Sequence, residues 1–500
     1  MKFLTQFKRN GLIYLPLAVL IIGVVVRIAT VYLVDASYLY DEIIVTRVSR
    51  QEISQLLETI RFEPHPPGFY LFLKLLPVFE TKITKIIITL INFSLTLLGL
   101  TYAYKRGIIR KYNISAGLAL FLASFSFFSL SAIVKQDSLS FPILLLFIFV
   151  LLSAVVQKKK AVVKELFFAN ILTVVLLLLG YIYYLQALFL LFFLTVYLRK
   201  ERLSKYFFAA QLAILSIYLL VFGFEQIANN FSRFTWINDN TLSFMDTLSG
   251  NVIGLSNHFI ADVHLLTFIG LIAVAVIKYS RGKKKDMILV VAGLAAVLTV
   301  LGYAGLFARG RYVVFLLFLL SILAGWGLTA IKFRGKIVQS LIYLVILLPA
   351  FITFPTSIAA REQVNQEFRA QIIKYSKYKR TGFLTEHPIF PYIFNLDNKI
   401  ENVVPVNVFF PKMFENRSSL DSEVVQLDGY YRQVNVAEIK SLLSKNKLTE
   451  YIYLLDYQEG RGYYDPERLV LKALQESCKV EDIKAVLYKS VLFKFNECVF

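Results

Sequence analysis

The sequence predicts a polytopic all-α membrane domain of about eleven transmembrane helices, followed by a small soluble α/β domain. Three observations lead to this prediction. Of the 500 residues, 57% are hydrophobic and 18% charged, and the mean hydropathy is +0.62, which is too apolar for a soluble chain. Apolar blocks such as Leu166–Leu198 and Met287–Leu306 are too long for a globular core, whereas polar residues become frequent after Phe354. These features exclude a cytosolic enzyme, a secreted disulfide scaffold and a disordered regulator.

The basic residues that give the chain its net charge of +20 lie in short loops between apolar blocks. Their position predicts the orientation of the chain in a membrane. The basic loops are Lys105–Lys111, Lys158–Lys160, Arg199–Arg202, Arg281–Lys285 and Lys332–Lys336. Short loops rich in lysine and arginine mark the cytoplasmic side of a membrane protein. The N-terminus is therefore expected in the cytoplasm and the C-terminal domain outside it. No helix-turn-helix pattern or basic–aromatic platform is present, so no nucleic-acid partner is expected.

The predicted elements of the membrane domain, residues 1–354, follow from the length of each apolar run. The first run, Gly11–Val34, is too long for a signal peptide and lacks a cleavage site, so it is expected to remain as a span. Residues 35–67 then form an acidic outer loop, and Gly68–Phe79 is too short to cross, which favours a re-entrant or interfacial helix. The further spans are predicted at Ile83–Tyr104, Ile114–Ile133, Leu139–Val156, Leu166–Tyr181, Ile182–Leu198, Tyr206–Phe224, Asp262–Ile277, Met287–Leu306, Tyr312–Ile331 and Ile337–Phe354.

Residues 355–500 are expected to form an extracytoplasmic α/β domain. Tyr451–Leu455 and Lys484–Phe495 mix β-branched, aromatic and charged residues, which is typical of strands. Gln363–Tyr375 and Glu438–Leu443 have the periodicity of helices. The only two cysteines, Cys478 and Cys498, lie in this domain. An oxidising compartment would allow them to pair, and two buried thiols are the equal alternative.

On this topology, polar residues at the ends of the spans gather on the outer face. Asp41 and Glu42 follow the first span, and the segment Glu63–Gly68 ends the same loop. Lys135 and Asp137 lie in a tight outer turn, and Arg309 and Arg311 lie in a second one. Acids from one loop and bases from two others would thus meet at one membrane–water boundary. This arrangement suits a reaction between a lipid-borne phosphate and an acceptor that arrives from outside.

The same residues resemble those of a known family. Arg27 near the outer end of the first span, the Asp41-Glu42 pair and the segment HPPGFYLFLKL from His65 to Leu75 look like the C-type membrane glycosyltransferases. The bacterial branch of the protein O-mannosyltransferase and aminoarabinose transferase superfamily is the most similar. The resemblance covers residues 1–160 and reaches Arg309-Gly310-Arg311-Tyr312.

The resemblance implies a multi-pass enzyme of the bacterial inner membrane. Such an enzyme moves a sugar, with inversion, from a polyprenyl-phosphate donor to a hydroxyl of a lipid, glycan or protein acceptor. Asp41 matches the family's catalytic aspartate and would act as the general base, because a hydroxyl attacks readily only as its proton leaves. Glu42 and His65 would contact substrate. Lys135, Arg309 and Arg311 are the cations available for the departing lipid phosphate.

No cofactor is required by these residues, although a divalent metal ion is one option. Glu42, Glu63 and His65 together could bind such an ion, as happens in some relatives. The chain departs from relatives that have Glu-Lys-Pro-Pro, because Pro64 and His65 precede its proline pair.

Simpler readings and other functions stay open at this point. Asp41 and Glu42 alone would be an ordinary solvated acidic loop, and Lys135 and Arg309 would be anchors to lipid headgroups. Pro66 and Pro67 would simply begin a helix. A transporter or flippase of lipid-linked substrates is an alternative function, although the two halves look unrelated and the spans carry little charge. A surface-glycan polymerase or ligase is another, but it gives no reason for the early acidic pair beside the proline motif.

Overall fold

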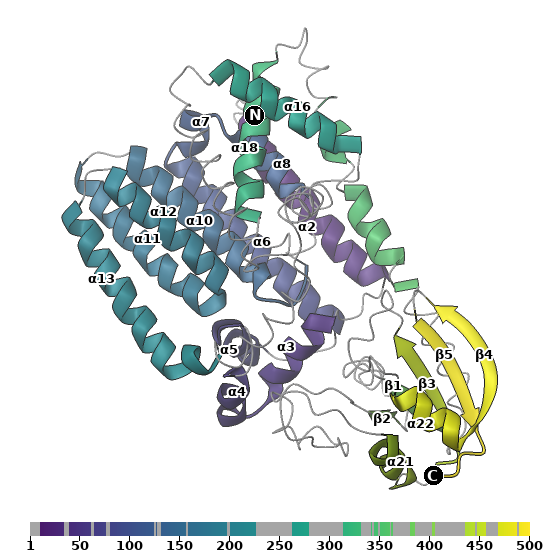
Figure 1. Ribbon diagram of the computed structural model, residues 1–500. Helices are drawn as coiled ribbons and strands as arrows, with labels where there is room; N and C mark the ends of the chain where they lie inside the picture. The colour runs from purple at the N-terminus through teal and green to yellow at the C-terminus, as the bar shows by residue number, and fades with distance from the viewer. Residues whose placement is uncertain are drawn as a thin grey trace. The chain divides into compact units, whose positions relative to one another are not determined.

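The computed structural model forms two compact units, which consist of residues 1–36 with 48–358 and residues 37–47 with 359–500 (Figure 1). The residues that the structure describes are 11–34, 40–61, 65–76, 81–124, 127, 132–156, 159–197, 201–226, 263–279, 314–331, 342, 345–348, 351–360, 362–363, 381–385, 403–405, 436–445, 448–456, 469–487 and 490–500. The first two turns of one helix, α3 (Tyr40–Arg50), are grouped with the second unit.

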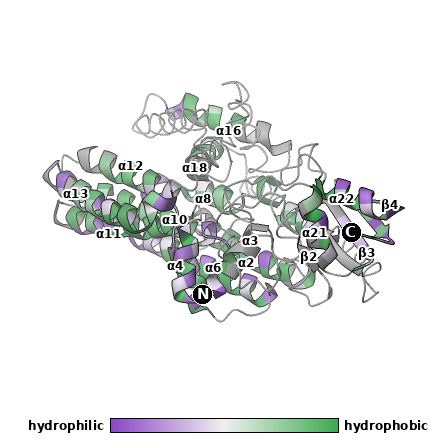
Figure 2. Ribbon diagram, turned by 60° about the horizontal axis from the view of Figure 1, so that its bottom comes forward, coloured by the Kyte–Doolittle hydropathy of each residue, from purple (hydrophilic) through white to green (hydrophobic). Residues whose placement is uncertain are grey.

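The first unit is a bundle of apolar helices, which Figure 2 shows coloured largely as hydrophobic. In chain order its elements are η1 (Gly11–Tyr14), α2 (Leu15–Val34), α4 (Ile53–Ile60), α5 (Gly68–Leu75), α6 (Thr81–Lys105), α7 (Ile108–Tyr112), α8 (Ser115–Leu122), α10 (Asp137–Val156), α11 (Lys159–Leu179), α12 (Tyr181–Tyr197), α13 (Glu201–Tyr218), a π-helical turn η2 (Leu219–Gly223), α16 (Val263–Tyr279) and α18 (Val314–Ala330). Helix α10 packs between α6 and α11, and α11 packs against α12. Helix α8 packs between α2 and α18.

Several of the predicted spans are long apolar helices. Among the residues that the structure describes, five helices are long and apolar enough to cross a membrane, namely Leu15–Val34, Lys82–Lys105, Asp137–Val155, Val162–Leu179 and Lys205–Gln226. They indicate a membrane protein. The division of Leu166–Leu198 into two helices is confirmed, because α11 ends at Leu179 and α12 begins at Tyr181. The predicted span Met287–Leu306 lies outside the described residues, and the total of eleven crossings stays a prediction.

The prediction of one continuous span over Ile114–Ile133 is wrong. Helix α8 ends after eight residues at Leu122, and residues 132–135 form a bend. The physical reason lies at Ser124, whose N–H bonds to Phe121 O at 3.0 Å while its Oγ accepts the N–H of Phe127 at 3.3 Å. A serine that accepts the N–H three residues ahead is a helix N-cap, so it closes one helix and favours a new start.

The outer loop predicted over residues 35–67 also contains helices. Helix α3 begins at Tyr40, and α4 covers Ile53–Ile60. Leu56 and Ile60 are buried on one face of α4, whereas Glu52 and Glu58 are exposed. Two of the acidic residues that suggested a loop, Glu52 and Glu58, thus lie on the solvated side of an amphipathic helix.

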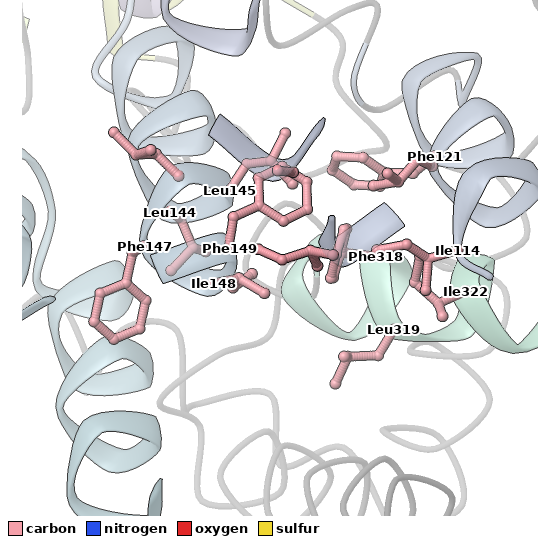
Figure 3. Packing of buried hydrophobic residues seen from close by; sticks show 14 of the residues in the cluster. Ile114, Phe121, Leu144, Leu145, Phe147, Ile148, Phe149, Phe318, Leu319 and Ile322 are labelled. Carbon is pink, nitrogen blue, oxygen red and sulfur yellow. The ribbon is translucent and has the colours of Figure 1, made fainter. Parts of the chain in front are cut away.

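One continuous core joins α8, α10 and α18 (Figure 3). Phe121 of α8 meets Phe318 of α18 edge to face at a centroid distance of 5.3 Å. Phe147 and Phe149 of α10 are fully buried in the same cluster. Edge-to-face pairs add to the gain from burial, so this region fixes how the three helices cross.

Glycines permit the closest of these crossings. A Cβ at Gly325 of α18 would lie 2.2 Å from Gly117 N of α8, and a Cβ at Gly117 would lie 2.5 Å from Ile322 Cα. The backbones therefore touch without an intervening side chain, as small residues allow in membrane bundles. Trp326 extends the contact by donating from Nε1 to Tyr112 O at 2.9 Å.

Gly325→Ala is expected to lower the stability of the bundle by about 1–3 kcal/mol, because the added methyl group meets backbone atoms that cannot move aside. Gly270→Ala on α16 is the matched control, since a Cβ there has nothing within 4 Å. The control should be neutral or slightly stabilising, because alanine favours a helix over glycine. Thermal unfolding of both variants in detergent measures the difference. Equal Tm values would contradict the close crossing.

The second unit contains a five-stranded mixed sheet in the order β2-β1-β3-β5-β4. Its elements are β1 (Thr381–Thr385), β2 (Val403–Pro405), α21 (Val436–Lys445), β3 (Glu450–Asp456), α22 (Leu469–Ser477), β4 (Lys479–Leu487) and β5 (Ser490–Asn496). Strand β1 pairs in parallel with β2 and β3, and β5 pairs antiparallel with β3 and β4. The helix predicted at Glu438–Leu443 and the strand predicted at Tyr451–Leu455 are confirmed as α21 and β3. The helix predicted at Gln363–Tyr375 lies almost wholly outside the described residues.

The range Lys484–Phe495, whose composition is typical of strands, contains the end of β4 and most of β5. Leu487 pairs with Ser490 across a hairpin, so the apolar run on both sides belongs to two strands. Glu481 of β4 accepts hydrogen bonds from Lys494 Nζ and Asn496 Nδ2 of β5, each at 2.6 Å. These bonds, that from Lys494 first, lower the pKa of the Glu481 carboxyl.

A small core lies where the sheet meets α21 and α22. Tyr451 and Tyr453 are two residues apart on β3, so they share one face of the sheet, and both are fully buried. Tyr451 donates to Leu443 O at 3.1 Å, and burial raises the pKa of its hydroxyl to about 12. The sheet therefore has its own hydrophobic core, as a separate domain requires.

Cys478 and Cys498 form a disulfide bond, which settles the alternative that the sequence left open. The bond joins the residue after α22 to the last residues of the chain. Two backbone bonds hold the same segment, from Val499 N to Ser477 O at 2.8 Å and from Cys498 N to Thr449 O at 3.0 Å.

Reduction of this disulfide is expected to destabilise the C-terminal unit by about 3 kcal/mol, because the bond closes a loop of about twenty residues in the unfolded chain. Thermal unfolding of the full-length protein with and without reductant measures the loss. The double variant Cys478→Ser/Cys498→Ser is the control, since reductant should not change its Tm. The bond would be refuted if a maleimide labelled both cysteines in the unreduced, denatured protein.

Candidate functional site

Two segments of the first unit that the sequence placed on one face meet at His65. His65 Nδ1 lies 3.1 Å from Gln136 Nε2, across 71 positions of sequence. The contact joins the side-chain amide of Gln136 to the imidazole of His65, so it fixes the direction of the ring. Gln136 lies between Lys135 and Asp137, so the proline motif and the predicted outer turn form one site.

The turn that carries Lys135 and Asp137 is buried and internally bonded. Ser138 Oγ donates to Lys135 O at 2.7 Å, and Ser140 Oγ donates to Gln136 O at 2.9 Å. Asn92 Nδ2 of α6 reaches Ser138 O at 2.6 Å. The tight turn predicted here is confirmed, and side chains bond to its backbone.

Lys135 and Asp137 are each only 2% exposed. A lysine that anchors lipid headgroups lies at the surface, so burial argues against that reading for Lys135. Asp137 accepts a hydrogen bond from the hydroxyl of Tyr183 through Oδ1. Its Oδ2 has no hydrogen-bond partner among the described residues. A carboxylate at the first position of α10 is also favoured by the helix dipole.

Helix α5 begins where the sequence predicted, at the proline pair. Pro67 is the N-cap, and its carbonyl accepts the N–H of Leu71 at 3.0 Å. Glycine suits the next position, Gly68, because a Cβ there would lie 2.5 Å from Leu178 O of α11. At the other end, Lys74 Nζ donates to Gln51 O at 2.6 Å. The motif thus packs the start of α5 directly on the backbone of α11.

Gln226, after η2, bonds to both ends of the segment that leads to His65. Its Nε2 donates to Ile60 O at 2.7 Å and to His65 O at 3.2 Å. Its Oε1 accepts from the hydroxyls of Tyr218, at 3.1 Å, and Tyr181. Gln226, Tyr181 and Tyr218 were not predicted as site residues, because uncharged polar residues in an apolar helix give no pattern in the sequence.

Asp41 and Glu42 lie in the first turn of α3, in the segment grouped with the second unit. Glu42 is fully buried, and the hydroxyl of Thr46 donates to its carbonyl at 2.6 Å. The solvated loop proposed as the simple alternative for this pair therefore does not describe Glu42. The pair belongs to a different compact unit from His65 and Lys135.

Arg27 is fully buried inside the first unit. Its guanidinium lies over the ring of Phe127 at 5.6 Å from the centroid. A cation over an aromatic face is stabilised when desolvated, which gives Arg27 a structural role in the bundle.

Three predicted site residues, Glu63, Arg309 and Arg311, lie outside the described residues. The proposed metal set of Glu42, Glu63 and His65 therefore stays a prediction. Within the part of the chain that the structure describes, no group of three histidine, cysteine, aspartate or glutamate side chains is placed to hold a metal ion.

Comparisons of the chain with protein-family models, with curated proteins and with solved structures found no match. The chemistry of the site therefore has to be argued from its own residues.

Gly68→Ala is expected to push α5 away from α11, because the new methyl group meets a backbone carbonyl. The variant should lose about 1–3 kcal/mol of stability and exchange its amides faster over residues 65–76. Gly99→Ala on α6 is the control, since its Cβ would make only ordinary contacts at 3.7 Å. Hydrogen–deuterium exchange of the two full-length variants makes the comparison. Wild-type protection of α5 in Gly68→Ala would refute the close approach.

Proposed function

We propose that this protein is an integral membrane glycosyltransferase. It moves a sugar from a polyprenyl-phosphate donor to a hydroxyl acceptor on the extracytoplasmic face. The observation that carries this proposal is the contact between His65 and Gln136, beside the buried Lys135. The segment that resembles the glycosyltransferase motif thus lies against the turn expected to bind the lipid phosphate.

The roles predicted from the sequence suit the two halves of the reaction. Attack by a hydroxyl needs a base that takes its proton, and Asp41 has that role in the proposal. Departure of the lipid phosphate needs positive charge, which Lys135 supplies together with Arg309 and Arg311. His65 and Glu42 have the role of binding substrate in the proposal. Direct displacement of the phosphate by the acceptor inverts the anomeric carbon.

A divalent metal ion held by Glu42, Glu63 and His65 remains an optional part of this proposal. If bound, the ion would neutralise charge on the phosphate. Asp41 keeps the same role in either case.

The location we propose is the bacterial inner membrane, with many passes and a cytoplasmic N-terminus. The disulfide between Cys478 and Cys498 supports an extracytoplasmic C-terminal domain, because such bonds persist in oxidising compartments. The donor sugar is carried on a lipid, so the acceptor, whether lipid, glycan or protein, would approach from outside.

Asp41→Asn is expected to lower turnover by roughly 10²- to 10⁴-fold, because asparagine keeps the size but cannot accept the acceptor's proton. Radiolabelled polyprenyl-phosphate sugars are added to the protein in nanodiscs, and the single-turnover rate of sugar transfer to a hydroxyl acceptor is measured. Donor binding is measured separately and should survive the change.

The control is Glu52→Gln, which removes an exposed acid from the same segment and should leave the rate unchanged. Wild-type turnover in Asp41→Asn would exclude Asp41 as the base. Movement of intact donor across vesicles, without any sugar transfer by the wild-type protein, would support a flippase instead.

A further inference from the structure

We propose that Gln226 is a positioning residue, which clamps the segment from Ile60 to His65 and thereby fixes His65 for the phosphate donor. The role of His65 in this statement rests on the proposed function. The clamp itself rests on the geometry of the first unit alone.

The amide of Gln226 uses all its hydrogen-bonding positions. An amide side chain offers two N–H donors and one oxygen that accepts two bonds. Both donors go to the segment, at Ile60 O and His65 O, and both acceptor positions go to Tyr181 and Tyr218. The two hydroxyls also lie 2.7 Å from each other. Gln226 is 3% exposed, so water does not replace these bonds cheaply.

The two carbonyls that Gln226 binds need an outside donor. Ile60 is the last residue of α4, and the last carbonyls of a helix have no donor within it. His65 precedes Pro66 and Pro67, which have no N–H groups to offer to nearby carbonyls. One side chain thus satisfies two backbone groups that the local sequence leaves without partners, and these groups bracket the segment.

His65 is consequently held from two separate elements. Gln226 fixes its backbone from the end of α13 and η2, and Gln136 fixes its ring from the turn before α10. The imidazole ring of His65 is therefore held in a defined direction. Arg61 and Glu225 add an exposed ion pair at 3.5 Å between the same two segments, which contributes little by itself.

A fixed imidazole is worth more to the reaction than a mobile one, because its orientation is set before charge develops on the phosphate. Loss of the clamp should lower kcat more than it changes the KM for the donor. Misplacement of a reacting group by about 1 Å costs on the order of 10²-fold in rate. We therefore expect a 10- to 100-fold loss in kcat.

The test compares Gln226→Leu with Gln211→Leu in the full-length protein in nanodiscs. Gln211 is the matched control, because it is an equally buried amide of α13 that donates to Asn170 O and Oδ1, at 3.1 and 2.9 Å. Both variants lose a buried amide, but only the first releases the segment. A third variant, Gln226→Glu, keeps an oxygen that accepts from the two tyrosines but lacks the amide N–H groups. It replaces Gln226→Leu in the test if that variant does not fold.

Two readouts separate the clamp from the proposed function. Hydrogen–deuterium exchange over residues 60–65 should rise in the Gln226 variants and stay at the wild-type level in Gln211→Leu. Donor turnover should fall in the Gln226 variants alone, with the KM changed less than about threefold. Equal exchange in the Gln226 and Gln211 variants would overturn the clamp, and faster exchange with wild-type kcat would overturn the positioning role. If the wild-type protein transfers no sugar, the proposed function fails, and the exchange result still decides the clamp.

Discussion

The structure of the first unit depends on one constraint, which is that a helix break inside an apolar bundle must find hydrogen-bond partners for its backbone. Each break described above is closed by side chains. Ser124 accepts the N–H of Phe127 after α8, and Ser138 donates to Lys135 O before α10. Gln226 donates to the carbonyls of Ile60 and His65 between α4 and α5. The breaks therefore have fixed geometry, and the candidate site is built from two of them.

Glycines let the helices that carry these breaks come together. Gly117 and Gly325 bring α8 against α18, while Gly68 brings α5 against α11. In lipid the hydrophobic effect does not drive helices together, so close backbone packing and hydrogen bonds must do so. His65 then lies beside Gln136 because α5 and the turn before α10 both belong to this packed region.

Hydropathy predicted the long helices well, because an apolar run of about twenty residues has few alternatives in a membrane protein. It failed at α8, where one serine ends the helix without interrupting the apolar run, and at α4, whose acidic face resembled a loop. In the site, the motif at His65 and the turn at Lys135 were predicted from charge and proline. Gln136 and Gln226 were not predicted, because the role of an uncharged amide depends on the carbonyls and rings that it contacts in the folded protein.

Lys82 and Lys135 also differ in burial, which bears on their proposed interaction with a lipid phosphate. Lys82, at the start of α6, lies over the ring of Tyr32 at 5.3 Å and is partly exposed, which is the usual placement of a lysine at a membrane boundary. Lys135 is enclosed by the bundle, where the attraction between opposite charges is less screened than in water. In the proposed reaction the phosphate of the donor carries negative charge, so its attraction to the buried Lys135 would be screened less than its attraction to the partly exposed Lys82.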